Sequence, residues 1–194
     1  LVGTQMLSKG LDFENVSLVG ILNADTMLNF PDFRAHERAY QMMVQVSGRA
    51  GRSKKQGNVA IQTYNPNHQI LQQVSTTSYA EMYKEQLQDR WEYKYPPYYR
   101  LIKITLTHRD YNKVDKGINW LAKAFQQSFG EYVLGPTAPA VSRIRNRYIK
   151  NLVIKVPPKQ SLANTKNQIT KIKNTFEAVS DFRPIRFIID VDAY

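Results

Sequence analysis

Tyr95-Pro96-Pro97-Tyr98 divides this chain of 194 residues into two parts that follow different patterns. Neither proline has an amide hydrogen to donate, and each disfavours helical geometry in the residue before it, so a helix must end ahead of this stretch. Upstream, Ser78 and Glu81 form a capping-box pattern, and the apolar residues that follow recur at helical spacing. The sequence therefore predicts a linker helix from about Tyr79 to Tyr93, within a linker and proline hinge that spans residues 78–98.

The part before the hinge has the pattern of an α/β fold. Residues 16–22 form a nearly continuous apolar run, which is typical of a strand buried on both faces of a parallel sheet. Residues 57–64 alternate as a strand does. Residues 36–46 are predicted to form a helix with one apolar face, made of Ala39, Met42, Met43 and Val46.

The part after the hinge has six predicted elements in the order strand, helix, strand, strand, helix, strand. The strands are expected at residues 101–107, 132–134, 148–156 and 185–191. Asp110 is expected to cap the first helix, and the second carries apolar residues from Leu162 to Val179. This order predicts an α+β domain of the split β-α-β type, with both helices on one face of an open sheet. Trp91 and Trp120 lie on apolar stripes and are expected in the core.

The positive charge is concentrated after the hinge. The chain has a net charge of +11; residues 1–98 contain ten Lys and Arg against nine Asp and Glu, whereas residues 99–194 contain seventeen against seven. A concentrated basic surface binds polyanions through counterion release, and nucleic acid is the usual polyanion. A basic surface that only improves solubility is the alternative.

Composition excludes several other classes of site. Cysteine is absent, which removes disulfides, cysteine nucleophiles and zinc–cysteine sites from this sequence, and His36, His68 and His108 show no ligand spacing. No metal site is therefore expected. No apolar run approaches the roughly 20 residues of a membrane helix, and the sequence does not open with a signal-peptide pattern, so no membrane partner is expected.

Gln45-Val46-Ser47-Gly48-Arg49-Ala50-Gly51-Arg52 is a candidate phosphate-binding segment. Two arginines in a bend opened by glycines can surround a phosphate, and the planar guanidinium suits that geometry better than lysine. Gln45 and Arg49 share a helix face if the helix extends that far. The alternative is an ordinary helix end with cationic residues and a glycine cap.

Arginines also alternate in the segment from Ser142 to Lys150. If this segment is extended, Arg143, Arg145 and Arg147 share one face and Tyr148 lies on the other. Guanidinium groups suit phosphates, and a nearby aromatic ring can stack on an unpaired base. The DNA-binding candidates are Arg143, Arg145, Arg147, Tyr148 and Lys150, with a solvated charged loop as the alternative.

The segment from Gln45 to Arg52 resembles motif VI of superfamily 2 helicases. In that family the arginines reach the γ-phosphate of ATP bound on the other lobe. The resemblance implies that Arg52 is the arginine finger, which stabilises charge during phosphoryl transfer, and that Arg49 is its partner. It also implies that Gln45 positions groups around the phosphate.

The segment from Gly3 to Phe13 resembles motif V of the same superfamily, and it precedes the motif VI segment as the family's order requires. The resemblance implies that Thr4 and Gln5 contact the nucleic-acid backbone. It implies that Gly10 and Asp12 approach the nucleotide. A turn or capping role is the alternative for Asp12.

Further motifs resemble the primosomal protein N-prime (PriA) family within this superfamily, and they extend over the whole chain: Gly3–Gly10, Asp32–Arg38, Gly48–Arg52, Tyr95–Tyr98, Leu134–Pro136, Arg143–Tyr148 and Asp190–Asp192. Ala193 stands where the family usually has proline. The resemblance implies that residues 1–77 are the remainder of a RecA-like second helicase lobe. It implies that residues 99–194 form a basic C-terminal DNA-binding domain resembling a small-subunit ribosomal protein fold.

The function implied by this resemblance is that of an ATP-dependent 3′→5′ DNA helicase of the bacterial cytoplasm and nucleoid. Such a helicase recognises stalled or branched replication forks and initiates primosome assembly for replication restart. The implied partners are fork DNA, single-strand-binding protein and other primosome proteins, and the implied cofactors are ATP and Mg, with zinc expected only upstream of this sequence. The alternatives are a non-enzymatic basic nucleic-acid-binding module with vestigial helicase motifs, and a different superfamily 2 helicase.

We expect this chain alone to hydrolyse no ATP. It contains neither Gly-x-x-x-x-Gly-Lys-Ser/Thr nor Asp-Glu-x-His, so the lobe that holds the phosphates and the metal ion is missing. Phosphate release from Mg-ATP should equal that of buffer, with or without DNA. Turnover by the pure chain would contradict this expectation.

Overall fold

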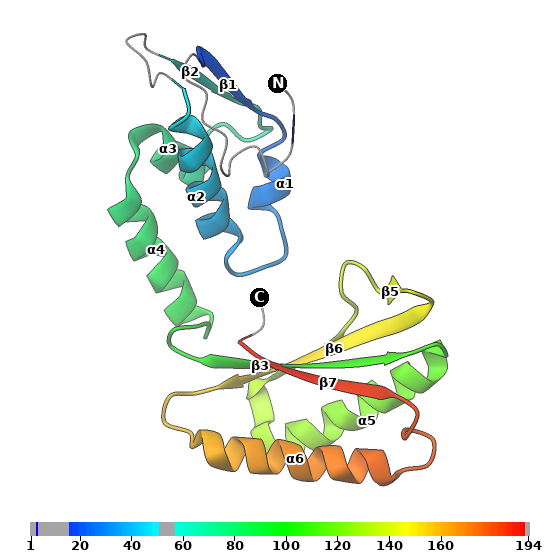
Figure 1. Cartoon of the computed structure of the whole chain (residues 1–194). Helices are drawn as coiled ribbons and strands as arrows, with labels where there is room; N and C mark the ends of the chain where they lie inside the picture. The colour runs from blue at the N-terminus through cyan, green and yellow to red at the C-terminus, as the bar shows by residue number, and fades with distance from the viewer. Residues whose placement is uncertain (1–2, 4–15, 51–56, 193–194) are drawn as a thin grey trace. The chain divides into compact units, whose positions relative to one another are not determined.

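The computed structural model describes residue 3, residues 16–50 and residues 57–192. The chain divides into two compact units, Leu1–Asp89 and Arg90–Tyr194, and the boundary falls within helix α4 (Tyr79–Glu92) (Figure 1). None of the helices in the described ranges is long and apolar enough to span a membrane.

Two parallel strands form the sheet of the first unit. Strands β1 (Leu18–Ile21) and β2 (Asn58–Ile61) pair with Leu18 opposite Asn58. The expectation of burial on both faces is wrong, because Val19 and Ile21 are buried while Leu18 is 63% exposed and Leu22 is 74% exposed. Successive strand residues point to opposite faces, and the described residues cover only one of these faces.

The described part of this unit also contains the helices α1 (Asp25–Leu28), α2 (Ala35–Ser47) and α3 (Gln69–Thr76) and most of α4, and α2 contacts strand β1. Their shared core contains Leu28, Ala39, Tyr40, Met43, Ile70, Leu71, Val74 and Met82. The linker helix is confirmed at Tyr79–Glu92, but Trp91 is 66% exposed, so its expected place in the core is wrong. Helix α3 was not expected from the sequence.

The second unit contains a mixed set of strands and helices in the predicted order. Its elements are β3 (Arg100–His108), α5 (Tyr111–Phe129), the 3-10 helix η2 (Gly130–Tyr132), β4 (Val133–Thr137), β5 (Arg143–Ile144), β6 (Arg147–Val156), α6 (Leu162–Ala178) and β7 (Arg186–Val191). The sheet order is β4-β6-β3-β7, every pairing is antiparallel, and the additional short strand β5 pairs with β6. Because β6 lies between β4 and β3, the split β-α-β arrangement is confirmed.

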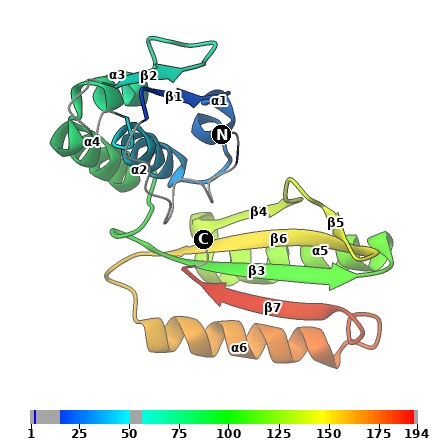
Figure 2. The same cartoon turned by 45° about the horizontal axis from the view of Figure 1, so that its top comes forward.

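Helices α5 and α6 cover one face of this sheet (Figures 1 and 2). Ile104 and Leu106 of β3 and Leu152 and Ile154 of β6 are fully buried in the core on that side. The alternate residues lie on the opposite face, called the open face: on β3 and β6 these include Lys103, Thr105, Thr107, Arg147, Asn151, Val153 and Lys155.

The apolar stripe of α5 is confirmed, since Val114, Ile118, Leu121 and Phe125 are fully buried. Asp110 caps the helix as expected, because its Oδ1 accepts hydrogen bonds from the amides of Asn112 at 2.8 Å and Lys113 at 3.3 Å. 

A close approach explains the glycine in the middle of α5. A Cβ atom on Gly117 would lie 3.0 Å from Ile185 Cδ1 and 3.3 Å from the Phe176 ring. Phe176 is itself fully buried, and its ring is stacked on Phe182 at 4.9 Å. This cluster joins α5, α6 and the turn before β7.

A buried lysine holds the proline hinge against the open face. Lys155 is 8% exposed, its amine donates a hydrogen bond to the carbonyl oxygen of Tyr93, and it lies 3.8 Å from the centre of the Tyr95 ring. Burial lowers the pKa of Lys155, and the charge of Lys94 lowers this pKa further. Lys94 in turn forms an ion pair with Glu131 at 3.3 Å.

Replacing Phe176 with alanine should destabilise the second unit by about 3–5 kcal/mol, because a large side chain is removed from a site that water cannot fill favourably. Trp120 belongs to this unit and lies 5.9 Å from the Phe176 ring between ring centres, so its fluorescence during urea unfolding, measured in a Trp91→Phe background, reports on this unit. Lys171→Ala, on the exposed side of α6, should change the stability by less than about 0.5 kcal/mol. Equal effects of the two substitutions would contradict this packing.

Candidate nucleic-acid interface

The candidate phosphate-binding segment begins at the end of α2. Gln45 is exposed on the last turn of the helix, which ends at Ser47, and the Gly48 amide donates to the carbonyl oxygens of Val44 and Val46. Arg49 and Ala50 continue as a hydrogen-bonded turn, with the Arg49 amide 3.0 Å from the Val46 carbonyl oxygen. Gln45 and Arg49 are therefore close in the chain, but they do not share a continuous helix face.

Several predicted site residues lie outside the described residues. They are Arg52 of the motif VI segment and Thr4, Gln5, Gly10 and Asp12 of the motif V segment. Their roles, and those of Gln45 and Arg49, stay predictions.

The segment from Arg143 to Lys150 forms a tight β-hairpin. Strand β5 pairs with the start of β6, with Arg143 opposite Tyr148 and Ile144 opposite Arg147. The two residues between the strands have positive φ angles, 47° at Arg145 and 60° at Asn146, as a two-residue turn of type I′ requires. This turn matches the twist of paired strands, and asparagine tolerates the left-handed conformation well.

This hairpin corrects the expected arrangement of the arginines. A single extended strand would place all three on one face, but the turn at Arg145 reverses the chain. Directly opposite residues share a face, so Arg143 lies with Tyr148 on the helix side, and Arg147 lies with Ile144 on the open face. Arg145 stands at the tip, so the three guanidinium groups start in three different directions.

Tyr148 supports Arg143 on the helix side of the hairpin. The Arg143 guanidinium carbon lies 4.9 Å from the centre of the Tyr148 ring, and Arg143 also donates to the side-chain oxygen of Asn146. Tyr111 at the start of α5 meets the same ring edge-on at 5.5 Å. Tyr148 is partly buried against the core and therefore acts first as a platform for Arg143.

Lys150 is already engaged within the domain. Its amine forms an ion pair with Asp115 of α5 and lies 5.1 Å from the centre of the Tyr111 ring. The hydrogen bond to Asp115 raises the pKa of Lys150 above its usual value. Tyr111 and Asp115 were not identified from the sequence, because only the tertiary packing of α5 against the sheet brings them beside this hairpin. Asn146 was not identified, because its contact with Arg143 depends on the turn.

A second polar site lies in the first unit, between α2, α3 and α4. The rings of His36 and His68 meet edge-on at 5.2 Å, and the amide of Ile70 donates to His68 Nδ1 at 3.2 Å. Burial lowers the pKa of His36, the charge of His68 lowers it further, and Asp89 opposes both effects. Within the described ranges, no group of three or more His, Cys, Asp or Glu side chains is placed to hold a metal ion.

The second unit is a small α+β domain with a basic hairpin at one end of its sheet. The family model described as "Primosomal protein N C-terminal domain" matches residues 92–194. This chain therefore belongs to the primosomal protein N family.

Curated relatives match along the whole chain. The Replication restart protein PriA of Bacillus subtilis (strain 168) is 39% identical over 196 residues, which cover 100% of this chain and 24% of that protein. The PriA proteins of Synechocystis sp. (38% identical; 99% of this chain, 22% of the relative) and Haemophilus influenzae (36% identical; 99% of this chain, 26% of the relative) are also similar. The chain thus spans about a quarter of the length of these relatives.

We expect the stability of the first unit to fall on acidification below about pH 6.5. The folded state holds the pKa of His36 below its ordinary value of 6.5, so the unfolded state binds more protons as the pH falls through this range. Stability linked to His36 is present above pH 6.5 and is lost as the pH falls toward the folded pKa. Urea unfolding followed by far-ultraviolet circular dichroism between pH 7.5 and 5 measures this dependence.

His36→Gln should flatten the pH dependence, because glutamine has no proton to bind in this range. His108→Gln, in the second unit, is the matched control and should leave the dependence of the first unit unchanged. Identical pH profiles for the parent and His36→Gln would contradict the assignment to His36.

Proposed function

We propose that this chain is the C-terminal part of an ATP-dependent 3′→5′ DNA helicase that recognises stalled or branched replication forks and initiates primosome assembly. Membership of the primosomal protein N family, together with relatives named as replication restart proteins, supports a role in replication restart. The arginine hairpin of the second unit is the observation that carries the DNA-binding part of the proposal.

The second unit binds fork DNA through the hairpin arginines in this proposal. Arg143, Arg145 and Arg147 are exposed, and guanidinium groups form paired hydrogen bonds with phosphate oxygens. Lys150 contributes less direct contact than expected from the sequence, because Asp115 already balances its charge. Tyr148 contributes by supporting Arg143.

The first unit supplies cationic groups to a nucleotide that another lobe binds. The position of the arginines is consistent with this role. Arg49 lies in the turn that ends α2, and Arg52 follows it by three residues in the sequence. Guanidinium groups at this place stabilise the negative charge that develops on the γ-phosphate when Mg-ATP is hydrolysed. Arg52 is the proposed finger, Arg49 its partner and Gln45 the positioning residue.

The remaining roles follow from the family. Gly10 and Asp12 approach the nucleotide, and Thr4 and Gln5 contact the DNA backbone. The complete protein works in the bacterial cytoplasm with single-strand-binding protein and other primosome proteins, and its zinc site lies outside this sequence. A basic module without motor activity is the competing function, and the presence of ATP hydrolysis in the complete protein separates the two.

Fluorescence anisotropy with labelled fork DNA across a salt series tests the DNA-binding role of this chain. Each phosphate contact contributes about 0.9 to the slope of log affinity against log salt, so the triple variant Arg143→Ala, Arg145→Ala, Arg147→Ala should lower the slope by roughly 2 to 3. Binding at about 0.15 M salt should weaken by tenfold or more.

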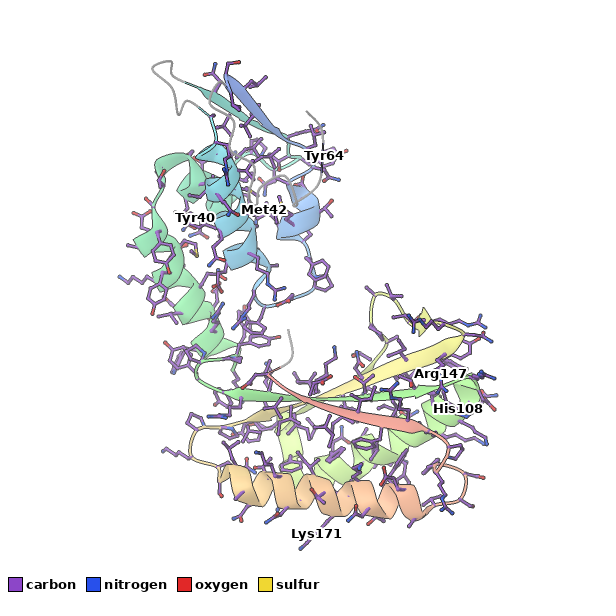
Figure 3. The ribbon with its side chains drawn as sticks, in the orientation of Figure 1. Tyr40, Met42, Tyr64, His108, Arg147 and Lys171 are labelled. Carbon is purple, nitrogen blue, oxygen red and sulfur yellow. The ribbon has the colours of Figure 1, made fainter. Side chains whose placement is uncertain are left out.

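A matched variant removes the same charge elsewhere: Lys166→Ala, Lys171→Ala, Lys173→Ala on α6. Figure 3 shows Lys171 pointing away from the sheet, and Lys173 forms an i,i+4 ion pair with Glu177 at 3.4 Å. This variant should retain most of the slope. Equal losses for both variants would mean that only net charge matters, and no binding by the parent would remove the DNA-binding role.

A further inference from the structure

The sheet of the second unit gathers arginines at one end. Strand β3 ends at His108, opposite Tyr148 near the start of β6, and β7 begins at Arg186, opposite Thr107. Figure 2 shows the end of β3, the start of β7 and the β5–β6 hairpin at this same end, and Figure 3 labels His108 and Arg147 there. Arg109 directly follows β3, and Arg183 lies in the turn before β7.

We call this set the arginine end: Arg109, Arg143, Arg145, Arg147, Arg183 and Arg186. All six residues are exposed, and they are six of the eight arginines in residues 90–194. Arg109, Arg183 and Arg186 were not identified from the sequence, because they lie roughly 35 to 45 positions from the hairpin arginines along the chain and only the pairing of the strands brings these segments to one end of the sheet.

The carboxylates near the arginine end do not neutralise its positive charge. Asp110 accepts the amides of Asn112 and Lys113 as the cap of α5, and Asp115 is paired with Lys150. Asp181 lies in the turn after α6. These acidic groups offset only part of the charge of six arginines.

The backbone beneath the added arginines is well fixed. The Arg183 amide donates to the Val179 carbonyl oxygen at 3.0 Å, and the neighbouring Phe182 is stacked on the fully buried Phe176. Arg186 is held in the β3–β7 ladder opposite Thr107. The guanidinium groups thus extend from a rigid frame, which reduces the entropy lost when they bind a ligand.

The arginine end is two-sided. Arg147 and Arg186 share the open face, Arg143 lies on the helix side, and Arg145 forms the tip between them. A flat surface that binds along one strand would need its cations on one side only. Cations on both faces and at the tip of a β-hairpin match a ligand with two phosphate strands, one on each side of a groove.

The open face is poorly equipped for single-stranded nucleic acid. Proteins that bind single strands on a sheet stack the bases on aromatic side chains. Among the described open-face residues of the central strands β3 and β6 there is no aromatic side chain: they are Leu101, Lys103, Thr105, Thr107, Arg147, Ile149, Asn151, Val153 and Lys155. Tyr148 and Tyr111 lie on the helix side and contact each other and Arg143.

We propose that the arginine end is a site for duplex DNA, in which the tip of the β5–β6 hairpin enters a groove and the arginines on its two sides contact the two phosphate strands. A two-stranded ribbon fits the major groove, which is about 12 Å wide. This inference rests on the proposed DNA-binding function and assigns Arg109, Arg183 and Arg186 to it.

The test measures binding of the 194-residue chain to a labelled duplex and to a single strand of the same length, across a salt series. Arg109→Ala, Arg183→Ala, Arg186→Ala should weaken duplex binding by roughly tenfold to a hundredfold at 0.15 M salt and lower the salt slope by roughly 2 to 3. The matched control Lys123→Ala, Lys166→Ala, Lys171→Ala removes the same charge from α5 and α6 and should remain within about threefold of the parent.

A pair of single variants tests the tip. Arg145→Gly removes the guanidinium and keeps a turn that glycine readily adopts, so it should weaken duplex binding about fivefold, as expected for one lost contact. The control is Lys159→Gly, which removes one positive charge from the exposed turn that follows the other end of β6, so it should bind the duplex within about twofold of the parent. Urea unfolding followed by tryptophan fluorescence confirms that each variant is folded.

The outcomes separate this inference from the proposed function. If the Arg109, Arg183, Arg186 variant binds like its control while the hairpin triple variant is weakened, the arginine end is wrong and the DNA-binding function stands. If the single strand binds more tightly than the duplex, entry into a groove is wrong. If the parent binds neither ligand, the proposed function itself fails.

Discussion

The antiparallel pairing of β3 with β6 determines which side chains of these two central strands enter the core and which lie on the open face. Nine residue pairs, from Arg100 opposite Val156 to His108 opposite Tyr148, fix this register. It directs Leu152 and Ile154 into the core and brings Lys150 to Asp115. A slip of one residue would exchange the two faces, burying lysines without partners and exposing the apolar residues. The cost of that exchange makes the register, and hence the basic surface, a consequence of the hydrophobic core.

Sequence reasoning succeeded where one periodic pattern determined the structure. The stripe of α5, the cap at Asp110 and the order of the strands all follow from local spacing, and all are confirmed. It failed at Arg145 and Asn146. The arginines alternate at positions 143, 145 and 147 through the two-residue turn, and neither turn residue is a glycine or proline that would have marked it. Trp91 lies on an apolar stripe of α4 but is exposed. The set of arginines beyond the hairpin depends on pairing between distant strands, which local patterns do not encode.

The charge available for binding differs from the charge counted in the sequence. Three of the lysines that make this unit basic connect its elements to one another. Lys94 pairs with Glu131, Lys150 pairs with Asp115, and Lys155 donates to the Tyr93 carbonyl oxygen. The hinge and α5 are attached to the sheet through these contacts. Arginine, with its weaker hydration and planar donors, is the residue that remains at the exposed end. Three lysines of this domain thus serve packing contacts, whereas the lysines of α5 and α6 stay at the surface with the arginines.

The hairpin tip lies in a two-residue turn, and the arginine end contributes none of its six side chains to the hydrophobic core. Substitutions there change the surface without creating cavities or burying unpaired charge. During evolution, the affinity and the preferred DNA shape of such a domain can drift under selection while its folding stability stays constant. The core and the recognition surface can therefore be changed separately by mutation.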